Sequence, residues 1–241
     1  MWNQTHKILG VLGGMGPLAT QLFYKQIIER TEVACDQDHM DMIILSHASM
    51  PDRTAAILSG RTEDLYKALL EDAKRLENNG VTAIAIPCNT SHFFVDKLQK
   101  EISVPIIHMI RETVKTLIEG SKIIDCVGIL ATDGTLKSEL YQKACVEIGI
   151  RPVVPTPESQ KLVMKIIYDG IKGGGKIDFN DFLIIERELN EKGCKAAIMA
   201  CTELSCFKEL YHLSDYYIDA MEVLAIKSIE ICGKKLKEKY K

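Results

Sequence analysis

Two cysteines stand at positions from which a thiol can act chemically. Cys88 follows the apolar run 84–87, and Cys201 follows the apolar run 196–200. Small polar residues and then a segment of helical character come after each cysteine, so both are predicted where a buried strand meets a helix N-terminus. The helix dipole and its free N–H groups stabilise a thiolate at such a place. Two thiols of this kind facing one cavity predict a paired reaction.

Paired thiols suit a reaction that needs an acid and a base on opposite sides of one atom. One thiolate removes a proton from a carbon, and the opposite thiol returns a proton to the other face. The carbanion formed between them requires hydrogen-bond donors placed in advance. The neighbouring turns offer such donors: the backbone of Met15 and Gly16 and the side chains of Asn89, Thr90 and Thr202.

The other six cysteines lack this setting. A lone reactive cysteine could be a nucleophile, a redox centre or a structural residue, so it is the pairing that favours proton transfer. No C-x-x-C pair and no Cys/His cluster with zinc spacing occurs, and no metal site is expected. The remaining thiols are expected to be small hydrophobes in a reducing compartment: Cys35, Cys126, Cys145, Cys194, Cys206 and Cys232.

Composition and charge set the class of protein. The 241 residues suffice for one large domain or two small ones, and 46% apolar with 26% charged residues is typical of a globular protein. A formal net charge of −3 favours neither nucleic acid nor an anionic membrane as a partner. No apolar run is long enough to span a bilayer. The run 8–19 is broken by glycines and has a weak basic region before it, so we exclude a signal peptide and expect a cytoplasmic protein.

Strand-like and helix-like segments alternate along the chain. This alternation predicts an α/β fold whose parallel sheet is covered by helices on both faces. The predicted strands are 7–12, 42–46, 84–86, 104–109, 125–131, 151–154, 196–200 and 216–218. The predicted helices are 18–31, 62–79, 91–100, 110–119, 136–148, 157–171, 178–192 and 220–239.

Two landmarks recur at nearly the same spacing. Gly10 and Gly128 lie 118 positions apart in similar strand–turn–helix segments, and Cys88 and Cys201 lie 113 positions apart. Such recurrence suggests an internal duplication, which would decide the architecture.

The duplication predicts two pseudo-symmetric, three-layer α/β/α domains with parallel four-stranded sheets. Residues 1–115 plus 218–241 are expected to form the N-terminal domain, and residues 116–217 the C-terminal domain. Each domain would contribute one cysteine from the end of a strand. The active site is then expected in the interdomain cleft.

Two cationic residues and one glycine turn are further candidates for a binding site. Arg53 follows the end of a predicted strand, where α/β sheets hold ligands, and a guanidinium can grip a carboxylate bidentately. The alternative is a surface arginine paired with Asp52 or with solvent. Lys172 begins a flexible glycine junction, from which it could reach a ligand or remain solvated. The turn 13–17 could bind an anion through its backbone or be a tight turn and nothing more.

Four short motifs occur in order along nearly the whole chain. They are L-G-G-M-G-P-L-A-T at 12–20, P-D-R-T at 51–54, P-C-N-T-S-H at 87–92 and C-T-E-L at 201–204. Together they are highly specific, and the chain resembles the aspartate/glutamate racemase family, which works without pyridoxal phosphate. The first two motifs together resemble aspartate racemases most. The resemblance implies an isomerase that interconverts L- and D-aspartate, or glutamate, and needs no cofactor.

The resemblance also implies roles for single residues. Cys88 and Cys201 would be the two catalytic acid/bases, with Cys201 deprotonating the L-form and Cys88 the D-form. Some relatives carry threonine in place of the first cysteine and act on one side only, so two cysteines imply interconversion in both directions. Arg53, assisted by Lys172, would bind the side-chain carboxylate of the substrate.

Other residues receive smaller roles from the resemblance. The remaining substrate-binding residues would be Met15, Asn89, Thr90 and Thr202, the last three gripping the α-carboxylate and ammonium. At Asp133 the second half departs from the family's run of threonines, so no role is assigned to Thr132. His92, Glu203 and Asp52 could each tune a cysteine or the arginine, or be ordinary helix-start residues. The partners implied are a small acidic amino acid and a second copy of the chain, as a homodimer.

Several readings stay open at this point. A hydantoin racemase, a maleate isomerase or a decarboxylase shares the twin-domain plan, although the arginine of P-D-R-T favours an acidic amino acid. Outside the enzymes, the chain could be a non-catalytic amino-acid-binding protein. It could also be a thiol-redox protein in which Cys88 and Cys201 form a reversible disulfide. Aspartate and glutamate differ by one methylene group, and residue types do not reveal the depth of a pocket.

Overall fold

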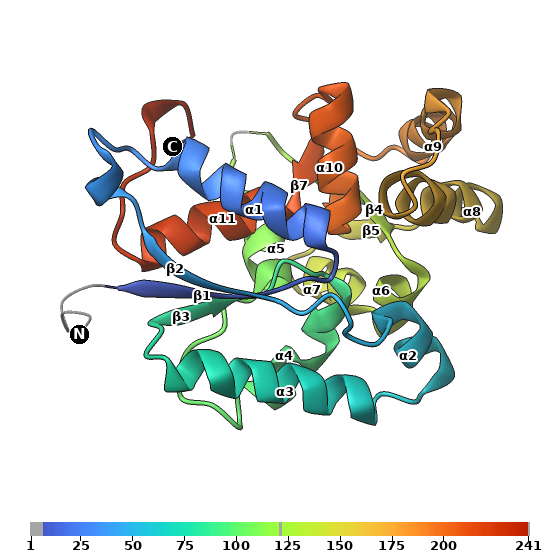
Figure 1. Cartoon of the computed structure of the whole chain (residues 1–241). Helices are drawn as coiled ribbons and strands as arrows, with labels where there is room; N and C mark the ends of the chain where they lie inside the picture. Colours follow the sequence, from blue (N-terminus) through green and yellow to red (C-terminus); the bar gives the residue numbers. More distant parts are fainter. Residues whose placement is uncertain (1–6, 121, 241) are drawn as a thin grey trace.

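The computed structural model describes residues 7–120 and 122–240, which fold around two parallel sheets (Figure 1). The first half contains β1 (Ile8–Gly13), α1 (Pro17–Arg30), η1 (Asp36–Asp38), β2 (Asp41–Ser46), α2 (Arg53–Ser59), α3 (Glu63–Asn78), β3 (Ala83–Ala85), η2 (Thr90–Phe94), α4 (Val95–Leu98) and α5 (Met109–Glu119). The second half contains β4 (Cys126–Ala131), α6 (Asp133–Ser138), α7 (Leu140–Glu147), β5 (Arg151–Val153), α8 (Pro157–Lys165), η3 (Ile166–Lys172), α9 (Phe179–Glu191), β6 (Ala196–Ala200), α10 (Thr202–Tyr211), β7 (Tyr217–Asp219), α11 (Ala220–Ile231) and η4 (Glu238–Tyr240).

The two sheets correspond in strand order and in register. The first has the order β2-β1-β3 and the second β5-β4-β6-β7, with every pair parallel. Gly10 lies opposite Ile84 in the first sheet, and Gly128 lies opposite Ala197 in the second. Ile84 and Ala197 are 113 positions apart, the same spacing as the two cysteines. The predicted α/β class with parallel sheets is therefore confirmed.

The prediction of four strands in each sheet is wrong for the first sheet, which has three. The segment 104–109 forms only an isolated parallel bridge between Ile84 and Ile106. Pro105 has no N–H to donate to a strand ladder. His108 is already the N-cap of α5, so the segment is too short to extend the pairing.

Several helices also differ from their predicted extents. The segment 136–148 is divided into α6 and α7 at Glu139, whose φ of 57° lies in the left-handed region. The segment 91–100 is the 3₁₀ helix η2 followed by the short α4. The segment 157–171 passes from α8 into a π-helix, η3. Helix α11 ends at Ile231, well before the predicted end.

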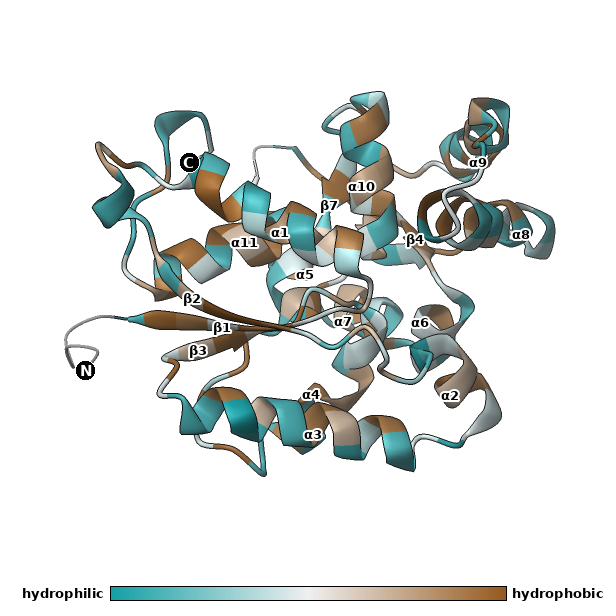
Figure 2. Cartoon of the chain, viewed as in Figure 1, coloured by the Kyte–Doolittle hydropathy of each residue, from teal (hydrophilic) through white to brown (hydrophobic). Residues whose placement is uncertain are grey.

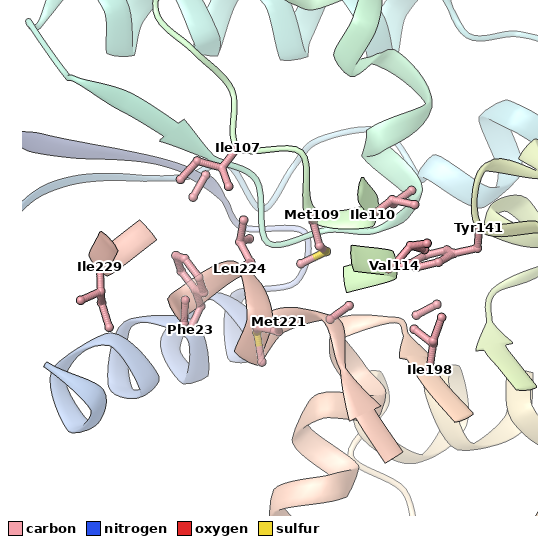
Figure 3. Packing of buried hydrophobic residues seen from close by; sticks show 14 of the residues in the cluster. Phe23, Ile107, Met109, Ile110, Val114, Tyr141, Ile198, Met221, Leu224 and Ile229 are labelled. Carbon is pink, nitrogen blue, oxygen red and sulfur yellow. The ribbon is translucent and has the colours of Figure 1, made fainter. Parts of the chain in front are cut away.

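The alternation of side chains along the central strands creates three apolar clusters. On β1, Leu9 and Val11 face one cluster while Ile8 and Leu12 face another. The first of these clusters also receives alternate residues of β4 and β6, so one continuous core joins the two sheets (Figure 3). Figure 2 shows the matching pattern, with hydrophobic strands inside and hydrophilic turns of α3 outside.

Helix α11 carries the end of the chain back to the first half. It packs against α1 and α5, with Met221 and Leu224 near Phe23 in the shared core (Figure 3). This return is consistent with placing residues from 220 onward beside the first sheet, whereas Asp219 still belongs to the second sheet. The domain division itself stays a prediction, and residues 1–6, 121 and 241 of it lie outside the described residues. No helix in the described ranges is long and apolar enough to cross a membrane.

Candidate active site

A pocket lies where the central strands of both sheets end. Its walls come from both halves. The segments that follow β1, β3, β4 and β6 all reach it, as expected for the carboxyl ends of parallel strands. All eight residues predicted for the site line this pocket: Met15, Arg53, Cys88, Asn89, Thr90, Lys172, Cys201 and Thr202. The other lining residues are Asp52, Thr54, Thr132, Tyr168 and Glu203.

Both thiols in the pocket are almost fully shielded from solvent. The exposed fraction is 5% for Cys88 and 6% for Cys201. Cys201 directly follows β6 and is the N-cap residue of α10, as predicted. Cys88 follows β3 but precedes the short 3₁₀ helix η2, so only Cys201 has the predicted place at an α-helix N-terminus.

The two thiols have neighbours of opposite charge. The Cys201 thiol donates a hydrogen bond to Glu203 Oε2 over 3.0 Å. Burial and the charge of Glu203 together raise the pKa of Cys201 well above its usual range. Cys88 instead lines the pocket with Arg53, whose guanidinium interacts with it electrostatically. The pocket is therefore symmetric in its thiols and asymmetric in its charges.

Arg53 is held inside the pocket as the first residue of α2. It is 9% exposed, so the alternative of a surface arginine is wrong. Nη1 donates to the carbonyl oxygens of Met50 and Pro51 at 3.4 and 3.2 Å. Burial opposes its charge, but Cys88 and Asp52 outweigh that effect and raise the pKa of Arg53. The guanidinium is thus a permanently charged group on the pocket wall.

Lys172 reaches the pocket from the second half and pairs with Glu203. Its Nζ lies 3.3 Å from Glu203 Oε1, so the alternative of a solvated lysine is also wrong. Burial opposes the charge, but Glu203 and Cys201 raise the pKa of Lys172. Lys172 is the last residue of the π-helix η3. Its Nζ lies over the ring of Tyr168, a residue of the same element, 4.9 Å from the ring centroid. The wide π turn places both side chains against the first half, where the Tyr168 hydroxyl donates to Asp52 Oδ2 at 3.5 Å.

Asn89 presents an unpaired donor. Its Oδ1 accepts a 2.6 Å hydrogen bond from the Tyr141 hydroxyl, which fixes the orientation of the amide. Its Nδ2 is buried and has no hydrogen-bond partner. A buried N–H₂ group without a partner is costly, and a carboxylate in the pocket would satisfy it.

Three threonine hydroxyls join the halves at the pocket. Thr90 Oγ1 lies 3.1 Å from Thr132 Oγ1 and 2.8 Å from Thr135 Oγ1, and the latter two are 3.2 Å apart. Thr132 is also the N-cap of α6, so the residue to which no role was assigned lies on the pocket wall. Close approach of α2 and α6 completes this contact, because a Cβ added to Gly134 would lie 2.8 Å from Thr54 Cα.

Gly134→Ala is expected to destabilise the protein by about 1–3 kcal/mol, because the new methyl group forces the backbone of α2 away from α6. Urea unfolding measures this change in free energy. Gly120→Ala is the matched control, since its Cβ would meet only the Thr116 oxygen, at 3.9 Å, and is expected to leave stability unchanged or slightly raised. Equal stability of the two variants would contradict the close contact.

His92 ties the turn at Cys88 to the start of α5. Its Nδ1 donates to the Cys88 carbonyl over 2.9 Å, and its Nε2 accepts from the Met109 N–H over 3.0 Å. One nitrogen donates and the other accepts, so the ring is neutral. Burial, and next the neighbouring charge of His108, lower the pKa of His92 to about 3. His92 therefore has a structural role: this structural clamp holds the turn at Cys88 against the start of α5.

This clamp predicts a pH dependence of stability. The unfolded chain takes up a proton at His92 as pH falls below about 6.5, whereas the folded protein resists it down to about 3. The contribution of His92 is therefore complete above pH 6.5 and is lost by about 1.4 kcal/mol per pH unit as pH falls toward 3. In urea unfolding between pH 7.5 and 4, His92→Asn should be less stable at pH 7.5 and show a shallower slope. His212→Asn, at an exposed histidine, should keep the wild-type slope.

Three lining residues were not assigned to the site from the sequence: Thr54, Tyr168 and Thr132. Tyr168 depends on the π-helix, for which no sequence signal exists, and Thr132 depends on contact between halves. Asp52 and Glu203 carried a signal, as polar neighbours of Arg53 and Cys201. Among the described residues, no group of three or more His, Cys, Asp or Glu side chains is arranged to hold a metal ion.

The two α/β halves have corresponding strand orders, and one strand of each sheet leads to a cysteine at the shared pocket. These features define a pseudo-symmetric protein with two sheets. The profile of the Asp/Glu/Hydantoin racemase family matches residues 12–226 of the chain. The protein therefore belongs to this family of racemases, and the family resemblance read from the sequence is confirmed.

Individual relatives agree with this assignment. The chain is 29% identical to the broad specificity amino-acid racemase RacX of Bacillus subtilis over 224 residues, which is 90% of this chain and 95% of that protein. Its structure is similar to that of Picrophilus torridus aspartate racemase, with a TM-score of 0.83, 28% identity and 97% of both chains covered. An aspartate racemase homologue from Pyrococcus horikoshii gives a TM-score of 0.74 at 26% identity, covering 95% of this chain and 99% of that one.

Proposed function

We propose that the protein is a cofactor-independent racemase that interconverts L- and D-aspartate by moving the α-proton between Cys88 and Cys201. The observation that carries the proposal is the placing of these two thiols. They follow corresponding strands of the two sheets and line one shielded pocket together with Arg53 and Lys172. The similarity to Picrophilus torridus aspartate racemase supports aspartate as the substrate to test first.

The proposed reaction has two proton transfers. The thiolate of one cysteine takes the α-proton and becomes a thiol, leaving an electron pair on the α-carbon that delocalises into the carboxylate. The thiol of the other cysteine gives its proton to the opposite face and becomes a thiolate. Protein groups that donate hydrogen bonds to the substrate carboxylate stabilise the intermediate. The unpaired Nδ2 of Asn89 is the best placed of these donors.

Recognition of the second carboxylate is proposed for Arg53, with Lys172 beside it. Arg53 is charged and buried, and Nη1 is the atom through which it donates to the backbone oxygens of Met50 and Pro51. Bidentate binding of a carboxylate suits the planar guanidinium. Thr90 and Thr202 would hold the α-carboxylate and ammonium, and Met15 would pack against the substrate.

The test is α-proton exchange followed by NMR in deuterated buffer. L- and D-aspartate and L- and D-glutamate are offered separately, with no cofactor added and with alanine as a substrate that lacks the second carboxylate. Exchange with inversion for aspartate is the expected result. If only glutamate or only alanine exchanged its α-proton, that amino acid would replace aspartate as the proposed substrate. If none of the amino acids exchanged, the proposed racemase function would be overturned. The homodimer and the cytoplasmic location stay predictions, and light scattering in solution would measure the first.

A further inference from the structure

Glu203 is the one acidic side chain in direct contact with either thiol of the pocket, within the described residues. It is 4% exposed and belongs to the first turn of α10, where the helix dipole stabilises negative charge. Its Oε2 accepts a hydrogen bond from the Cys201 thiol at 3.0 Å, while its Oε1 lies 3.3 Å from Lys172 Nζ. The carboxylate therefore stands between a thiol that donates to it and an ammonium that balances its charge.

Cys88 has a different arrangement around it. The cationic side chains of Arg53 and Lys172 line the pocket with it, and among the described residues its thiol makes no hydrogen bond to a carboxylate. A second thiolate at Cys201 would meet the Glu203 carboxylate at contact distance, and like charges so close repel strongly. The two cysteines thus differ in the charged side chains that surround them.

We infer that Glu203 holds Cys201 as the protonated member of the pair in the resting protein, so that Cys201 gives a proton and Cys88 takes one in the first turnover. This inference rests on the proposed function and adds Glu203 to it as a positioning residue. In that turnover the Cys88 thiolate gains the α-proton, and the Cys201 S–H bond breaks to form the new C–H bond. The resting protein is therefore prepared for one enantiomer, the one whose α-proton faces Cys88.

The S–H stretching band in infrared spectra tests the inference without substrate. Wild type minus Cys201→Ser should show an S–H band at lower frequency than that of unbonded thiols, because the thiol donates to a carboxylate. Glu203→Gln should move the Cys201 band to higher frequency, and Glu203→Asp, which keeps a carboxylate, should move it less.

Asp219→Asn is the matched control. Asp219 is also 4% exposed and accepts hydrogen bonds from Ser205 Oγ and the Met221 N–H, away from both thiols of the pocket. Its substitution should leave the Cys201 band unchanged. A missing Cys201 band, or a Cys201 band that does not move in Glu203→Gln, would each overturn the inference.

The outcomes separate this inference from the proposed function. The expected bands together with no α-proton exchange would overturn the racemase and the order of turnover, while the bond between Glu203 and Cys201 would stand. Exchange with inversion together with an unshifted Cys201 band would overturn the inference about Glu203 alone.

Discussion

Serine in place of either Cys88 or Cys201 is expected to lower racemisation by about 10²–10⁴-fold, the usual contribution of a positioned acid or base. A hydroxyl has nearly the shape of a thiol but is a far weaker acid, so it neither returns the proton nor stays ionised to take one. Both thiols are buried against the substrate space, so water is poorly placed to replace them. Chiral chromatography of the products from each enantiomer measures the rates.

The control for these variants is Cys206→Ser. Cys206 lies on the same helix as Cys201 but outside the residues that line the pocket, and it should retain the wild-type rate. Because the equilibrium constant of a racemisation is one, each variant must change kcat/KM by the same factor for both enantiomers. A Cys88→Ser or Cys201→Ser protein within about tenfold of wild type would sink the two-thiol reaction.

Arg53→Gln is expected to lower kcat/KM for aspartate by about 10²–10³-fold, since losing one partner of a buried charged pair costs roughly 2–5 kcal/mol. Arg53→Lys should recover only part of this loss, because an ammonium keeps the charge but not the planar pair of donors. Steady-state kinetics with aspartate and with alanine provide the decisive comparison. Alanine has no second carboxylate, so its kcat/KM should change much less.

The control for Arg53 is Arg61→Gln, which removes an exposed arginine just beyond the end of α2 and should have no effect. Equal losses for aspartate and alanine would mean that Arg53 acts on the thiols or on the α-carboxylate instead. A Lys172→Gln protein with a larger aspartate-specific loss than Arg53→Gln would move the side-chain carboxylate to Lys172.

Strand ends were the most predictable part of this molecule. Apolar runs stop at a turn residue, and side chains at those ends must meet at one edge of a parallel sheet. This is why Cys88 and Cys201 could be expected in one pocket from the sequence, whereas Arg53 was assigned to the pocket through the family resemblance. The register shared by Gly10 and Gly128 was visible as well, because it repeats the same residue type at corresponding places.

Features that depend on contacts between distant segments could not be predicted. The break at Glu139 occurs at a residue type that rarely adopts a positive φ. An isolated bridge at Ile106 replaces the predicted strand because Pro105 and the start of α5 at His108 leave too few residues for pairing. The pattern of apolar residues alone does not reveal this limit. Tyr168 and Lys172 reach the pocket through a π-helix, which local composition does not encode. The hydrogen bond between Glu203 and Cys201 was indicated in the sequence only by the short distance between them along the chain.

The shielding of the two thiols has a consequence for kinetics. In the proposed reaction, a molecule that has just converted one enantiomer holds its mobile proton on the opposite sulfur and matches only the reverse conversion. Exposed fractions of 5% and 6% leave little contact through which water can reset it. The free protein thus keeps the protonation state of the two cysteines that its last turnover produced. At high concentrations of one enantiomer this resetting step, and no longer proton removal from carbon, is expected to limit the rate.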